Sequence, residues 1–130
     1  MDIEYEIVQA LRDVTGEAAA TRYPDPRPDR FIHVRRKGGP TALDSAPMTD
    51  VFRDKPLIDI MVSAESESAA VALADTVQSF MLSAVRDQPF SVPCYGVTQS
   101  IRAWSDDTLN GVFIAPRVWL SYDLDMRYNG

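Results

Sequence analysis

Residues 117–128, RVWLSYDLDMRY, alternate between apolar and polar side chains along their whole length. A period of two residues is typical of a β-strand with one face on the hydrophobic core and the other in solvent. We therefore predict a C-terminal strand. Its core face comprises Val118, Leu120, Tyr122, Leu124, Met126 and Tyr128, and its polar face comprises Arg117, Trp119, Ser121, Asp123, Asp125 and Arg127.

Three further strands are predicted upstream of this one. Residues 31–37 and 56–64 also alternate, and they pair most simply as an antiparallel hairpin around a long loop at 41–55. Residues 95–104 form another strand, which ends in a turn at 106–111, where an Asn-Gly dipeptide favours tight hairpins. The core-facing residues expected from the first two strands are Ile32, Val34, Ile58, Ile60, Val62 and Ala64.

Two helices complete the set of expected elements. Residues 2–13 have apolar side chains at helical spacing, with Asp2 as N-cap and Gly16 as the stop. Residues 66–86 form a longer helix that begins after Ser66. The expected buried stripes are Ile3, Ile7, Leu11 and Val14 in the first helix, and Ala70, Leu73, Val77, Phe80, Met81, Ala84 and Val85 in the second.

The order of these elements, α-β-β-α-β-β, predicts the fold class. It favours an α+β protein with a mainly antiparallel or mixed sheet flanked by two helices. The chain of 130 residues has the length of one domain, which we expect to span residues 1–130. Neither an internal repeat nor a low-complexity segment divides it.

Composition excludes several classes of function. A single Cys gives no disulfide framework and no Cys-based zinc site, and a single His leaves little for a His-rich metal site. No apolar run approaches the roughly 20 residues that span a bilayer, and the acidic N-terminus has no secretory signal core. Dinucleotide, P-loop and metalloprotease motifs are missing. We expect no catalysis, no cofactor, no metal and no membrane partner.

Charge is distributed unevenly along the chain. Six basic and two acidic residues lie between Arg22 and Lys37, a local charge of +4, which leaves −10 for the rest of a chain whose net charge is −6. One interpretation is a surface that binds nucleic acid, although only Tyr23 and Phe31 offer stacking rings there. The other is a basic surface that meets an acidic surface of another copy, in a head-to-tail contact that can close into a ring.

Other polar residues have ordinary structural explanations. His33 lies on a predicted strand and Cys94 has no partner thiol, so neither has the neighbours that a nucleophilic site needs. Asp123 and Asp125 share one strand face, where paired carboxylates can serve acid–base chemistry or bind magnesium. A solvated strand face accounts for them more simply.

Four segments of the chain form a recognisable series. The first is the proline- and arginine-rich run RPDRFIHVRRKGG at 27–39, and the second is the Asp-x-Pro strand DKPLIDIMV at 54–62. The third is the alanine-rich helix after Ser66, and the last is the late Pro-Arg strand PRVWL at 116–120. Together they span most of the chain, and in this order they resemble the tail terminator proteins of actinobacterial long-tailed phages.

This resemblance implies a structural role in the virion. It implies a small α+β subunit of a ring, usually hexameric, made in the host cytoplasm and placed at the head-proximal end of the tail tube. There it would end tube polymerisation and contact the tail tube protein and a head-completion or connector protein. Genomic DNA would pass through the lumen without specific binding, since an acidic lining repels phosphates.

The charge distribution and the strand alternation suggest which residues would serve each role. The residues expected at a subunit or tail-tube interface are Arg27, Arg30, His33, Arg35, Arg36 and Lys37. Asp123 and Asp125 are the candidates for the ring lumen, and Met48, Val51 and Phe52 for anchors in a docking loop at 41–55. Two alternatives remain: a nucleic-acid-binding regulator that uses residues 22–37, and a small enzyme with a carboxylate site at Asp123 and Asp125.

Overall fold

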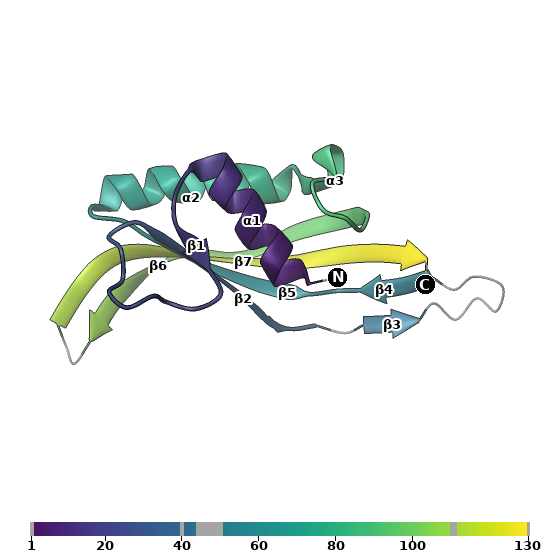
Figure 1. Ribbon diagram of the computed structural model, residues 1–130, viewed down its shortest axis with the longest axis horizontal. Coiled ribbons are helices and arrows are strands. Elements are labelled where there is room, and N and C mark those ends of the chain that lie inside the picture. The colour runs from purple at the N-terminus through teal and green to yellow at the C-terminus, as the bar shows by residue number, and fades with distance from the viewer. Residues whose placement is uncertain (1, 40, 44–50, 110–111, 130) are drawn as a thin grey trace.

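The computed structural model describes residues 2–39, 41–43, 51–109 and 112–129. It shows an α+β fold, as the sequence predicts, with the helices on one face of a seven-stranded sheet (Figure 1). The elements are α1 (Ile3–Thr15), β1 (Ala19–Ala20), β2 (Phe31–Gly38), β3 (Thr41–Leu43), β4 (Val51–Asp54), β5 (Leu57–Ser63), α2 (Glu67–Leu82), α3 (Ala84–Asp87), β6 (Cys94–Leu109) and β7 (Val112–Asn129).

Strand β7 organises the sheet. It pairs with β6 along one edge, while β5 and then β4 pair with successive parts of its other edge. Strand β2 pairs antiparallel with β5, which confirms the expected hairpin, and β1 adds a short parallel pair to the start of β2. The alternating pattern at 117–128 therefore lies in the centre of the sheet, where its apolar face is buried.

The prediction of one loop at 41–55 is wrong for the described residues. Thr41–Leu43 and Val51–Asp54 form strands β3 and β4, which pair with each other and extend the hairpin of β2 and β5. Strand β4 exists because β7 continues beyond the end of β5 and offers it a pairing edge. The two paired strands are far apart in the sequence, so no local periodicity predicts their pairing.

Two other boundaries also differ from expectation. Strand β6 continues to Leu109 and stays paired with β7, with a register shift between Asp107 and Thr108, so the predicted turn at 106–111 is replaced by strand over its described residues. The expected helix at 66–86 ends at Leu82, where Ser83 adopts the C-cap position, and α3 follows as a separate short helix. Gln88, in the left-handed region at φ 47°, ends α3.

Both main helices start as predicted. The Asp2 carboxylate accepts a hydrogen bond from the Tyr5 N–H, and the Ser66 hydroxyl accepts one from the Ala69 N–H. Gly16, at φ 70°, ends α1 in the left-handed region. In α1 Val8 is buried and Val14, in the last turn, is exposed, contrary to the predicted stripe.

The core lies between the helices and one face of the sheet. The predicted inward residues of β2, β5 and β7 are buried there, apart from Tyr128, whose side chain lies outside the described part of the structure. Tyr122 is the largest fully buried side chain. From α2 and α3, the stripe contributes Ala70, Leu73, Val77, Met81 and Ala84, while Phe80 is only partly buried and Val85 is exposed. Among the described residues, no helix is long and apolar enough to cross a membrane.

The opposite face of the sheet has no helix over it (Figure 1). We call this the helix-free face; its residues on β5 and β7 include Leu57, Asp59, Met61, Trp119 and Asp123. Leu57 is 40% exposed, and Met61 and Trp119 are half-buried. Helix side chains bury the other face of the sheet, but no described element packs on the helix-free face.

Candidate functional site

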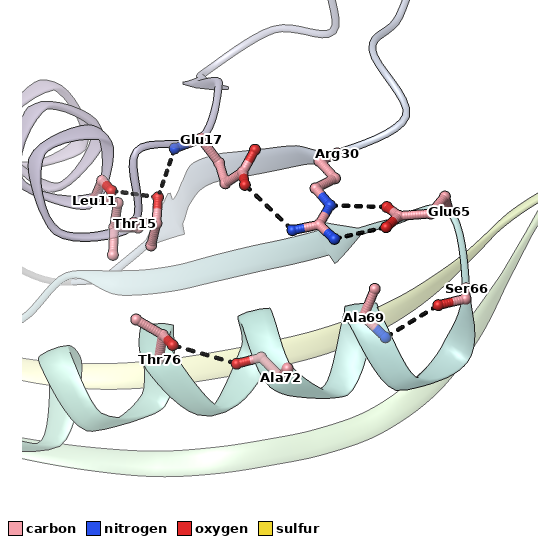
Figure 2. A network of polar contacts seen from close by, with 9 residues as sticks. All are labelled: Leu11, Thr15, Glu17, Arg30, Glu65, Ser66, Ala69, Ala72 and Thr76. Carbon is pink, nitrogen blue, oxygen red and sulfur yellow. Dashed lines mark hydrogen bonds and ion pairs between the residues drawn. The ribbon is translucent and has the colours of Figure 1, made fainter.

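Arg30, predicted at an interface, is held by two acidic residues of its own chain. Its guanidinium donates two hydrogen bonds to the Glu65 carboxylate, 2.6 and 2.8 Å long, and a longer one of 3.4 Å to Glu17 (Figure 2). The hydrogen bonds from Arg30 lower the pKa of Glu65 to about 2, and Glu65 raises the pKa of Arg30. Arg30 thus ties the start of β2 to the link between β5 and α2.

Arg36 spans the interruption in the long hairpin. Its guanidinium donates two hydrogen bonds to the Asp54 carboxylate, 2.7 and 3.0 Å long, and others to the carbonyls of Gly38 and Gly39. The Asp54 side chain is only 10% exposed. Such a bidentate, partly buried pair fixes geometry within the subunit. The Nε, Nη1 and Nη2 groups of Arg36 therefore all donate hydrogen bonds within the chain.

Lys37 contacts the helix-free face. Its ammonium lies 2.7 Å from the Asp59 carboxylate and 5.1 Å from the centre of the Trp119 ring. The Lys37 side chain remains 59% exposed, so a partner can still reach it. A cation over an indole ring is a favourable contact that keeps the aliphatic stem of the lysine against the sheet.

His33 and Arg27 surround Tyr23, which comes from the proline-rich segment before β2. The Tyr23 ring stacks on His33 at 4.4 Å between centroids, and the Arg27 guanidinium lies 5.0 Å from the Tyr23 centroid. His33 Nε2 lies 3.1 Å from the Thr21 carbonyl oxygen. Burial lowers the pKa of His33, and the positive charges of Arg35 and Arg117 act in the same direction.

Arg35 differs from its neighbours on β2. It is exposed, and it has no ion-pair partner within the described part of the chain. In the sheet it lies opposite Asp59, whose carboxylate pairs with Lys37 instead. Of the six residues predicted at an interface, Arg35 is the one whose charge is most fully available to another molecule.

The three residues predicted to anchor a docking loop, Met48, Val51 and Phe52, do not lie together in a loop among the described residues. Met48 lies outside the described residues. Val51 and Phe52 belong to β4, where their backbones pair with Asn129 and Tyr128 of β7. These two positions are thus part of the sheet rather than of a free loop, which corrects the prediction for them.

Asp123 and Asp125 share the helix-free face as predicted, but their surroundings differ. Asp123 is exposed, whereas Asp125 lies 3.1 Å from Arg127 and 3.8 Å from Arg53. Together they border a hollow of about 450 Å³, which is also lined by Lys55, Leu57, Gly96, Thr98 and Leu124. The two arginines partly neutralise Asp125, so Asp123 is the freer carboxylate.

The described residues contain no group of metal-ligating side chains large enough to hold an ion. Cys94 is buried, and burial raises the pKa of its thiol, which opposes a nucleophilic role. Trp119, Met61 and Leu57 form the apolar part of the helix-free face, and none of them is among the functional residues predicted from the sequence. Their signal was present, since all three occupy outward positions of alternating strands.

The predicted site residues thus do not gather in one pocket. Their cationic and carboxylate groups are spread over a broad face of the sheet, where another molecule could bind. Comparison with protein-family models and with curated proteins gave no match to this chain.

Proposed function

We propose that this protein is a structural subunit that forms a ring at the head-proximal end of a phage tail tube. In that role it ends tube polymerisation and joins the tail to the head-completion complex. The observation that supports the proposal is the one-sided fold: three helices cover one face of the sheet, and the other remains open with Leu57, Met61 and Trp119 partly exposed. Broad mixed surfaces of this kind are typical of association sites.

The charge distribution fits the same role. Arg35 and the exposed ammonium of Lys37 lie on β2, while Asp123 lies on the helix-free face near the centre of the sheet. If the part of this face around Asp123 lined the lumen, that carboxylate would repel the phosphates of DNA. Arg35 and Lys37 lie toward the β2 edge of the same face, where a neighbouring subunit can meet them. Arg30 and Arg36 act chiefly in holding the subunit together, so the interface role falls mainly to Arg35 and Lys37.

Tube polymerisation gives the decisive test. The chain is added to polymerising tail tube protein from its own genome, and tube length is measured by negative-stain electron microscopy. We expect rings at one end of each tube and an arrest of growth. Tubes that lengthen unchanged, with no ring at either end, would contradict the proposal.

DNA binding is measured in parallel, because the alternative function is a nucleic-acid-binding protein that uses residues 22–37. A regulator of that kind would bind duplex DNA with an affinity that falls steeply with salt. A tail terminator would show no such binding at physiological salt. Salt-dependent binding together with unaffected tubes would therefore favour the alternative.

A further inference from the structure

Both long edges of the sheet are open over part of their length. Strand β6 pairs with β7 on one side, and no described strand pairs with its other side. Strand β2 pairs with β5 on one side, while β1 covers its other side only at Ile32 and His33. An open edge carries backbone N–H and C=O groups that another strand can bind.

The two open edges are long enough to pair with each other. On β2 the uncovered part is Val34–Gly38, whose pairing with β5 shifts register between Arg36 and Gly38. On β6 the register shifts between Gln99 and Ile101, and the following residues, from Ile101 to Asp107, pair with β7 without a further shift. Ile101–Asp107 thus presents a straight edge of seven residues, which can accommodate the five-residue open part of β2 at 101–105.

Strand direction favours joining these two edges. Strands β2 and β7 both run antiparallel to β5, and β6 runs antiparallel to β7. A second copy placed beside the first in the same orientation therefore brings its β2 antiparallel to β6. The helices of both copies then lie on the same side of one continuous sheet, and so do the two helix-free faces.

Charge disfavours the symmetric alternative on one edge. Strand β2 carries Arg35, Arg36 and Lys37 in succession, so pairing β2 with β2 of another copy would oppose like charges. Pairing of β6 with β6 would leave both β2 edges open. Only the β2–β6 contact uses both edges of every copy, and such a head-to-tail contact repeats until it closes into a ring.

We infer that copies of this chain associate by antiparallel pairing of the β2 edge at 34–38 with the β6 edge at 101–105 of the next copy. This inference rests on the proposed function, since it gives the contact by which the ring would form. It predicts that the central sheet of each subunit continues into its neighbour.

Disulfide cross-linking tests the contact. Within one chain Arg35, Asp59, Ser121 and Ile101 lie in one row across four strands. The first and last are therefore about 14 Å apart, at about 4.8 Å per strand spacing. A disulfide requires α-carbons within about 7 Å, so a bond between these positions can form only between copies.

The variants are made in a Cys94→Ala background. Arg35→Cys is combined in turn with Ile101→Cys, Ala103→Cys or Ser105→Cys, which sample the possible registers on one sheet face. We expect one combination to give a ladder of covalent oligomers beyond the dimer under mild oxidation, and each single-cysteine variant to give no such ladder. Thermal unfolding of the reduced variants verifies that each is folded.

Other results would overturn the inference. Absence of a ladder from every folded combination would do so, as would a protein that stays monomeric at all concentrations. A dimer from the β6 single-cysteine variants alone would show symmetric pairing instead. Rings in micrographs without cross-links would reject this contact and leave the proposed function standing. Cross-linked open filaments that do not arrest tubes would support the contact and reject the function.

Discussion

Arg36 and Asp54 join the two strands of the long hairpin at the place where both strands are interrupted. Their side chains form two hydrogen bonds, 2.7 and 3.0 Å long, across the break that separates β2 from β3 and β4 from β5. The same guanidinium also binds the carbonyls of Gly38 and Gly39. The ion pair thus bridges the two halves of the hairpin across the break in its backbone ladder.

We expect Asp54→Asn to destabilise the protein by about 2 kcal/mol, because it removes a charge-assisted acceptor and leaves a half-buried guanidinium poorly paired. Urea unfolding monitored by tryptophan fluorescence measures the change. Asp87→Asn is the matched control, since the pair of Asp87 with Arg86 is exposed and such pairs contribute little. Equal effects of the two substitutions would contradict the assignment.

Gly39 lies close to the backbone of Lys55. A Cβ added there would clash with the Lys55 carbonyl oxygen, and the backbone has φ +95°. We expect Gly39→Ala to cost about 2 kcal/mol or more, from the clash and the strained backbone together. Gly38→Ala is the comparison, because Gly38 also has positive φ but open space around its Cβ position. A smaller loss at Gly39 than at Gly38 would refute the role of the clash.

The pair of Arg30 with Glu65 predicts an acid-dependent loss of stability. The pKa of Glu65 is about 2 in the folded protein, below its ordinary value of 4.5. Its contribution is therefore complete above pH 4.5 and declines as the pH falls toward 2. We expect Glu65→Gln to be less stable than the wild type at neutral pH, and the two to converge in acid. Because the pair is exposed, salt should reduce the difference. A constant difference across this range would exclude the mechanism.

His33 should titrate below its ordinary pKa of 6.5, because burial disfavours its charged form. The unfolded chain therefore binds a proton at His33 more readily than the folded chain does. The free energy of unfolding is unaffected by this proton above pH 6.5, and it falls as the pH drops from 6.5 toward the pKa of the folded state. The chain has one histidine, so its ring protons give a single NMR titration curve. A midpoint at or above 6.5 would contradict this prediction.

Arg35→Glu should weaken self-association at least about tenfold without changing stability, because Arg35 is exposed and lacks an ion-pair partner among the described residues. Sedimentation velocity over a concentration series measures the association. Arg22→Glu, an equal change of charge at an exposed position before β2, is the control and should have a smaller effect. Identical effects would indicate that only net charge matters.

Sequence periodicity was sufficient to predict most of the core. Alternation identified Ile32, Ile60 and Leu120 as buried, and helical spacing identified Ile7 and Val77. These predictions succeeded because each residue follows a local rule that its tertiary environment reinforces. The fold class followed from the order of the elements, and the structure confirms it.

Nonlocal pairing explains what could not be predicted. Strands β3 and β4 are too short for a periodic signal, and β4 depends on an edge of β7 more than 70 residues away. Likewise, the sequence of the basic run at 35–37 does not indicate which of its residues form ion pairs within the chain and which remain available to a partner. Arg36 meets Asp54 across the hairpin and Lys37 meets Asp59, while Arg35 points into solvent. Only the register of the sheet separates these roles.

Strand β7 also determines how the subunit would respond to mechanical load. It runs through the sheet as a single strand of 18 residues, with β4 and β5 following one another along one edge and β6 along the other. Tension along its axis would act on many ladder hydrogen bonds in shear at the same time. The bonds would have to break together rather than one after another, so the long axis of the sheet is its direction of greatest resistance.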